Sequence, residues 1–278
     1  MARPFQIDSP LTSFVQMSMQ DMGGFLSARP VLPIVGTDKL SFEYHKFNVK
    51  GLAPMTALDL RRERGSTFER FQTTSSTQTG LCLEYGVEVP RDLITLQNAD
   101  LDLAEADAMS AAIQVVGAKE ERLVTLMETD ANFGTAANAS TLSGQWSDDS
   151  SNPKQDINTA KRTIRTATNN SPGLYYAIIN EAVFHRLQLH PLVRDQFKFT
   201  TSEFPAEAIL ARYLGLDALF VGVAVEDTAA MGQDASLGNQ WSDSCAVYKV
   251  PPGNVGNGFN DCFAKQFNVN FALGGERA

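Results

Sequence analysis

The chain has 278 residues, of which 43% are hydrophobic and 20% charged, and its 23 basic and 32 acidic residues give a net charge of −9. These values are typical of a globular protein with one large or two moderate domains, and they argue against wholesale disorder or a fibrous repeat. The acidic balance also argues against sequence-independent attraction to nucleic acid, which needs a basic surface.

The cysteines and the apolar runs argue against disulfide-rich, zinc-binding, exported and membrane-spanning proteins. Cys82, Cys245 and Cys262 are odd in number, widely spaced and without a CxxC pair, so they indicate neither a disulfide framework nor a zinc knuckle. The first residues contain no signal-like apolar region, and the longest apolar run, Ala218 to Val225, is far shorter than the roughly 18 residues of a membrane span. We therefore expect neither export nor membrane insertion, and a reducing cytoplasm as the compartment of synthesis.

Residues 1–40 are predicted to form an extended arm. They contain four prolines and three glycines and show no sustained period, apart from a candidate short helix from Leu11 to Met19. An arm with apolar residues such as Phe5, Phe14 and Leu26 would be poorly stable by itself in water. We therefore expect the arm to lie on another surface.

Residues 41–93 are predicted to form a long β-hairpin. The outgoing strand is Ser41 to Val49, and the returning strand, Leu81 to Val89, alternates apolar and polar residues and is expected to bury one face. The intervening tip is almost wholly polar, and a solitary hairpin with little core is marginal in water, so we expect a neighbouring subunit to cover it. A merely solvated loop is the alternative. The tip residues assigned to an intersubunit contact are Arg61, Arg62, Glu63, Arg64, Glu69 and Arg70.

One long helix is predicted from Leu101 to Thr129. Its apolar residues fall at spacings of three, four and seven, and roughly 28 residues would span about 42 Å. The stripe consists of Met109, Ile113, Val116, Leu123 and Met127, and residues 130–150 follow as a loop.

The remaining chain alternates helices with strands, which predicts an α+β fold of mixed order. Pro205 is expected at the first position of one helix, which Gly215 ends. The predicted helices are 156–168, 181–189 and 205–214, and the predicted strands are 174–179, 219–226, 245–250 and 267–273, with a polar loop at 227–243.

Catalytic and metal-binding patterns are weak. His185 and His190 are about 140° apart around a helix and cannot share a face as metal ligands, which leaves only His45. The glycine cluster at 253–258 lacks phosphate-loop spacing, and Asp100, Asp102 and Asp107 lack the glycine and glutamate of a calcium loop. We expect no catalytic residue, no cofactor and no metal site.

The order of these elements resembles the Hong Kong 97-like major capsid fold of tailed double-stranded-DNA bacteriophages. LCLEYGVEVPRDLI (81–94) is similar to the family's return from its E-loop towards the spine helix. The block WSDDSSNPKQDINTAKRTIRTATNNSPGLYYAIINEAVFHRLQLHPLVRDQFKF (146–199) is similar to a recurring part of the A-domain. Two later segments resemble the strands that follow, FPAEAILARYLGLDALFVGVAVEDTA (204–229) and WSDSCAVYKVPP (241–252).

The resemblance implies a domain organisation. It comprises an N-terminal arm (1–40), an E-loop hairpin with its return strand (41–93), a P-domain with a spine helix (94–150), an A-domain (151–262) and a C-terminal strand returning to the P-domain (263–278).

The resemblance also implies a structural protein, not an enzyme. Its subunits would form the hexamers and pentamers of an icosahedral virion shell, assembled in the host bacterial cytoplasm and enclosing DNA without sequence-specific binding. The implied partners are other copies of the chain, a separate scaffolding protein, a portal and a candidate decoration protein. Two alternatives stay open: the shell of an encapsulin-type nanocompartment, which shares the fold, and a cytoplasmic α+β enzyme.

Overall fold

The computed structural model describes residues 24–47, 61, 64, 67, 75–92, 94, 103–133, 145–198, 205–230, 232–252 and 263–269. The chain divides into two compact units. Unit 1 comprises Met1–Val31, Glu84–Asp156 and Tyr176–Val247, and unit 2 comprises Leu32–Leu83, Ile157–Tyr175 and Tyr248–Ala278. Helices and strands alternate along the chain, which confirms the predicted α+β class.

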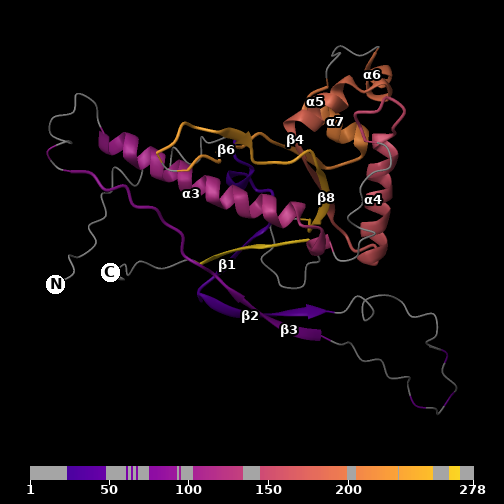
Figure 1. Cartoon of the computed structure of the whole chain (residues 1–278). Helices are drawn as coiled ribbons and strands as arrows, with labels where there is room; N and C mark the ends of the chain where they lie inside the picture. The colour runs from indigo at the N-terminus through magenta and orange to yellow at the C-terminus, as the bar shows by residue number, and fades with distance from the viewer. Residues whose placement is uncertain are drawn as a thin grey trace, which may run out of the picture. The chain divides into compact units, whose positions relative to one another are not determined.

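Unit 1 contains the long helix α3, Leu103–Glu128, which runs for 26 residues or about 39 Å (Figure 1). The predicted helix is confirmed, but its buried stripe begins later than expected. Met109 is 45% and Ile113 40% exposed, because the buried contacts lie in the second half of the helix. The short 3-10 helix η1, Leu26–Ala28, lies against α3 there, and η3, Asp130–Phe133, follows the helix. The buried residues of α3 are Ala112, Val116, Glu120, Leu123, Val124 and Met127.

A three-stranded sheet has the order β5–β4–β8, formed by β4 (Leu174–Asn180), β5 (Ala218–Gly222) and β8 (Cys245–Val250). The parallel pair β4–β5 aligns Tyr176 with Ala218 and Asn180 with Gly222. Aromatic and β-branched residues suit a buried strand, and Ala177, Ile178 and Ile179 of β4 are almost wholly buried. These strands are those that the sequence predicted.

Helices α5 (Glu181–Leu189) and α7 (Glu207–Leu214) lie against β5, and α4 (Pro153–Ala167) precedes β4. All three confirm predicted helices. Gly215 ends α7 in the left-handed region at φ 72°, whereas Pro205 lies before the N-cap Ala206 and not at the first helical position. Helix α6 (Pro191–Phe197) was not predicted.

The strand predicted at 219–226 is broken at Val223. Its second part, β6 (Val225–Asp227), leaves the sheet and pairs in antiparallel fashion with β7 (Leu237–Asn239), inside the segment expected to be a loop. The glycine at the end of β5 explains the break, because a Cβ at Gly222 would lie 2.5 Å from the ring of Trp241. Trp241 thus packs directly on the backbone where β5 ends.

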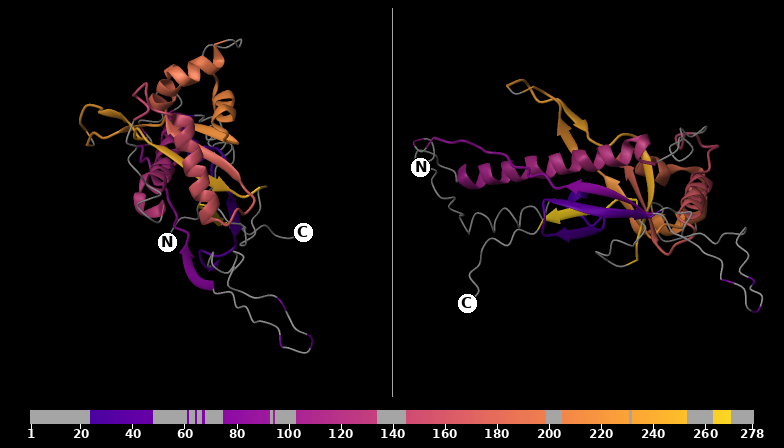
Figure 2. Two further views of the ribbon diagram at one scale, coloured as in Figure 1. Left: turned by 90° about the vertical axis from the view of Figure 1, so that its right-hand side faces the viewer. Right: turned by 90° about the horizontal axis from the view of Figure 1, so that it is seen from below.

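Unit 2 contains two strand pairs. Strands β1 (Ile34–Thr37) and β9 (Gln266–Val269) are parallel, and β2 (Ser41–Phe47) and β3 (Ser75–Leu81) form the predicted hairpin. The pairs lie side by side in Figures 1 and 2. The last strand starts where it was expected, and its continuation to residue 273 lies outside the described residues.

The predicted returning strand of the hairpin is wrong. The strand that pairs with β2 is the polar SSTQTGL of β3, so residues 82–90 lie beyond the ladder and form no strand. The alternating residues expected on a buried face are instead 40–66% exposed: Leu81, Leu83, Tyr85, Val87 and Val89. The alternation correctly indicated an extended segment, but the described residues leave its apolar side chains largely exposed.

Candidate assembly surfaces

The base of the hairpin is held by an aromatic cluster in unit 2. Phe42 and Tyr44 lie on one face of β2, and the ring centroid of Phe267 on β9 is 4.4 Å from that of Phe42 and 6.3 Å from that of Tyr44. Gly80, opposite Phe42, gives the ring room, since a Cβ there would lie 2.5 Å from it. The hairpin is therefore anchored at one end by its own chain.

Further along the ladder the hairpin is polar. The β3 residues that face β2 are serine, threonine and glutamine, and all from Ser75 to Thr79 are exposed. A bond of 3.0 Å from the Tyr44 hydroxyl to Gln78 Oε1 is among the few side-chain contacts between the strands. Exposed polar pairs contribute little to stability, so this part of the hairpin has no hydrophobic core of its own.

At the predicted tip, the structure describes Arg61 and Arg64, and both are exposed. Arg62, Glu63, Glu69 and Arg70 lie outside the described residues. The intersubunit contact assigned to these six residues stays a prediction.

The segment of residues 84–92, here called the strap, runs along α3 within unit 1. The Arg122 guanidinium lies 3.6 Å from the centre of the Tyr85 ring, and Arg91 forms a two-bond ion pair with Asp107 at 2.7 and 2.9 Å. The six steps from residue 85 to residue 91 extend about 20 Å, and the fifteen helical steps from residue 107 to residue 122 rise about 22 Å. The strap is therefore extended and antiparallel to α3, as Figures 1 and 2 also show.

Asp107, one of the three aspartates that lack a calcium-loop pattern, is paired with Arg91. The guanidinium hydrogen bonds hold the pKa of the Asp107 carboxyl below its ordinary value, and the carboxylate raises the pKa of Arg91. The Arg91 side chain is 43% exposed and that of Asp107 16%, so solvent weakens the pair, and it fixes the position of the strap more than it adds stability.

The described root of the arm is attached to α3 by a buried carboxylate. Glu120 is 0% exposed, its Oε2 accepts from the Ser27 backbone N–H at 2.6 Å, and its Oε1 accepts from Trp241 Nε1 at 2.8 Å. Lys119 donates from Nζ to the Ser27 carbonyl at 2.7 Å, and burial lowers the pKa of this lysine, with the Arg122 charge adding to the effect. Leu26 and Val31 are 1% and 2% exposed, so this root is buried within its own chain, and the prediction for residues 1–23 lies outside the described residues.

The buried position of Glu120 was not predicted, although the sequence contains a signal for it. It occupies a position on the apolar stripe, four residues after Val116, where an ionised group is unfavourable unless hydrogen bonds compensate. An acidic residue at such a position indicates partners from elsewhere in the chain, here Ser27 and Trp241.

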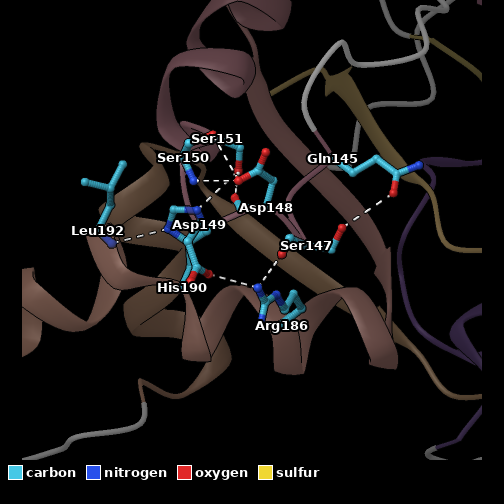
Figure 3. A network of polar contacts seen from close by, with 9 residues as sticks. All are labelled: Gln145, Ser147, Asp148, Asp149, Ser150, Ser151, Arg186, His190 and Leu192. Atoms are coloured by element: carbon cyan, nitrogen blue, oxygen red, sulfur yellow. Dashed lines mark hydrogen bonds and ion pairs between the residues drawn. The ribbon is translucent and has the colours of Figure 1, made fainter.

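A second polar network in unit 1 joins residues 145–151 to α5 and α6 (Figure 3). Arg186 donates to the Ser147 carbonyl and to Asp149 Oδ1, the latter at 2.9 Å. Asp148 Oδ1 accepts from the backbone N–H and the hydroxyl of Ser150, both at 2.9 Å, and these bonds lower the pKa of Asp148. The network fixes the loop that leads into α4.

His190 in this network lies near a serine, but the arrangement is structural. The buried imidazole caps α6, because its Nδ1 accepts from the Leu192 N–H at 3.3 Å. The ring therefore carries its proton on Nε2, which lies 3.2 Å from Ser151 Oγ and donates to it. A serine nucleophile needs a histidine nitrogen that accepts its proton, so this pair lacks the required geometry. His185 is exposed and lies 3.5 Å from Glu181.

A buried lysine was also missed. Lys249 on β8 is 3% exposed, and its Nζ donates to Thr168 Oγ1 at 3.0 Å and to Ser171 Oγ. A side chain at Gly173 would collide with it, which gives the glycine of the Ser-Pro-Gly turn a packing role. The alternating pattern of CAVYKV (245–250) does not indicate that Lys249 is buried, because the two hydroxyl groups that accept its hydrogen bonds come from another part of the sequence.

The described residues contain no group of three or more histidine, cysteine or acidic side chains that could hold a metal ion. Among them, no helix is long and apolar enough to cross a membrane. Burial raises the pKa of the Cys245 thiol to about 12, which argues against a reactive cysteine there.

Three comparisons place the chain among known proteins. No family model matches it. The major capsid protein of Pseudomonas phage JBD67 is 26% identical over 269 residues, which cover 92% of this chain and 81% of that protein.

One solved structure supports the fold. A phage-related protein from Bordetella bronchiseptica aligns with 97% of this chain and 84% of its own, with a TM-score of 0.65 and 16% identity. A virus-like particle from Pyrococcus furiosus aligns with a TM-score of only 0.42 and 13% identity, too low to indicate a shared fold. Over most of its length the chain is therefore similar to a phage major capsid protein, which confirms the resemblance drawn from its sequence.

Proposed function

We propose that this chain is the major capsid protein of a tailed phage, which self-assembles into the hexamers and pentamers of an icosahedral shell around double-stranded DNA. The observation that carries the proposal is the similarity to a phage major capsid protein along 92% of the chain. Such a shell protein is structural and not an enzyme.

The surfaces described above support self-assembly. The hairpin has an anchored base, a polar ladder and a charged tip, so its outer part is more stable when a neighbouring subunit covers it. The net charge of −9 suits the wall of a DNA container, because a wall that bound phosphate tightly would hinder packing and release of the genome.

The predicted domain organisation is part of the proposal. Residues 1–40 are the arm, 41–93 the E-loop, 94–150 the P-domain, 151–262 the A-domain and 263–278 the strand returning to the P-domain. Assembly takes place in the host bacterial cytoplasm with a scaffolding protein and a portal, and a decoration protein is a further candidate partner.

Electron microscopy of the expressed protein, with and without the phage's scaffolding protein, tests the proposal. Closed shells built from fivefold and sixfold clusters are expected. Discrete small oligomers under both conditions would contradict it and favour a soluble enzyme. Shells that enclose a cargo enzyme instead of DNA would favour a nanocompartment.

A further inference from the structure

Helix α4 concentrates positive charge in a chain that is acidic overall. Residues 157–175, which include most of α4 and the turn after it, contain three basic residues and no acidic one, although the whole chain has a net charge of −9. The three residues, here called the basic cluster, are Lys161, Arg162 and Arg165. Residues three and four apart are neighbours on a helix surface, so these cations lie on one side of α4.

The two arginines of the basic cluster can reach a ligand. Both are exposed, and neither guanidinium group has an ion-pair or hydrogen-bond partner among the described residues. Lys161 is partly buried, and its ammonium group lies 5.2 Å from the centre of the Tyr175 ring, which holds the side chain without neutralising its charge. The arginines therefore present positive charge that the described part of the chain does not compensate.

A further positive charge lies at the same end of the helix. The buried ammonium group of Lys249 is 3.0 Å from Thr168 Oγ1, and Thr168 follows Arg165 by three residues. The helix dipole favours a cation in the last turn of a helix, which explains Arg165. Because this effect is confined to the last turn, it explains neither Lys161 and Arg162 nor the absence of acidic residues around them.

The exposed surface of α4 differs from a typical protein–protein contact. In α4, which is described throughout, no large hydrophobic side chain is exposed, since Ile157 is 2% exposed and Ile164 is partly buried. The residues beside the arginines, such as Thr163 and Thr166, are exposed and polar. Protein interfaces have an apolar centre depleted of charge, whereas surfaces that bind nucleic acid are polar and positively charged. The basic cluster therefore fits a phosphate ligand better than a protein.

A polyanion is present wherever this chain would work. A guanidinium group binds phosphate through two parallel hydrogen bonds, and double-stranded DNA carries one negative charge per about 1.7 Å of helix axis. We propose that the basic cluster of α4 faces the interior of the shell and contacts backbone phosphates of the enclosed DNA. This inference rests on the proposed function and names the surface at which the wall meets the genome.

A contact of this size suits a container that must also release its contents. Three cations neutralise about three phosphates, and the acidic remainder of the chain repels the same polyanion. The contact carries no sequence information, because phosphates are the same in every sequence. The basic cluster therefore positions the outermost DNA without binding it tightly.

The first experiment measures the binding of the unassembled subunit to a short fluorescent DNA duplex. Anisotropy is followed at low ionic strength as the salt concentration is varied. Three neutralised phosphates give a slope of about −2.7 in a plot of log K against log salt concentration. Arg162→Gln with Arg165→Gln should bring the slope to about −0.9, because two of three contacts are lost. A parent that binds no duplex, or a double variant with the parent's slope, would overturn the inference.

Arg165→Gln and Arg212→Gln form a matched pair for this measurement. Each arginine is exposed in the last turn of its helix, α4 or α7, and neither guanidinium group has a partner among the described residues. Arg165→Gln should make the slope shallower by about 0.9, whereas Arg212→Gln should leave it unchanged, although each removes one positive charge. Equal changes would indicate a response to net charge and would overturn the inference.

The second experiment locates α4 in the particle by electron cryo-microscopy of DNA-filled shells. Helix α4 is expected on the inner face with DNA density beside Arg162 and Arg165, and that density should weaken in the double variant while shells form as in the parent. Helix α4 on the outer face would overturn the inference and leave the proposed function intact. So would a loss of shells from a folded double variant, which would indicate a protein partner at α4. A parent that forms no shell would contradict the proposed function and, with it, this inference.

Discussion

The lobe around β4 and the hairpin of β2 and β3 are stabilised in different ways. In the lobe, Ile178, Leu187 and Leu210 are at most 1% exposed, and helices pack on the strands from the same unit. In the hairpin, the ladder residues of β3 are exposed or only partly covered, and aromatic packing is confined to the base. The lobe carries its own hydrophobic core, whereas the described ladder of the hairpin has little apolar packing beyond its base, which is why we predict that a neighbouring subunit covers it.

The largest effect on the free energy of unfolding is expected in the lobe. Leu187→Ala should lower it by about 2–5 kcal/mol, because the side chain is 0% exposed and leaves a cavity. Leu189→Ala, two residues further along α5 and 48% exposed, is the control and should cost far less. Equilibrium urea denaturation measures both. Equal losses would contradict the assignment of the core.

A smaller loss in the free energy of unfolding is expected for a change where the arm joins α3. Glu120→Gln keeps the shape of the side chain, but its amide cannot accept from both Trp241 and the Ser27 N–H. One buried donor loses its partner, at a cost of about 1–3 kcal/mol. Glu121→Gln, the exposed neighbour on the same helix, should change the free energy of unfolding little.

Hydrogen exchange adds a local measurement to this comparison. In Glu120→Gln the Ser27 amide should exchange faster than in the parent, whereas core amides of β4 should change less. Unchanged protection at Ser27 would mean that Glu120 does not hold the arm.

The smallest effect on unfolding, and the largest on assembly, is expected at the hairpin tip. Arg62→Glu with Arg64→Glu should leave the melting temperature and helical content almost unchanged but impair shell formation, because the tip is predicted to bind a neighbour. The control is Arg162→Glu with Arg165→Glu, the same charge change on exposed positions of α4.

Electron microscopy and sedimentation compare the two double variants. Normal shells from the tip variant would contradict the assignment of the tip to an intersubunit contact. Loss of shells in both would point to net charge, and not the tip, as the cause.

Local patterns in the sequence predicted much of the fold. The period of three to four residues predicted α3, and the limits of α5 and β8 agree with the structure, because each has a clear period and marked ends. The break at Val223 and the helix α6 were not predicted, since they depend on Trp241 packing against Gly222 and on His190 acting as a cap.

The sequence by itself determined the α+β class, the long helix and the resemblance to capsid proteins, because periodicity and element order are local properties of the chain. Only the tertiary structure decided that β3, and not 81–89, pairs with β2, that Glu120 joins Ser27 to Trp241, and that Lys249 reaches Thr168. These contacts join residues distant in sequence, and a hydrophobic pattern specifies that a face is buried without specifying what buries it.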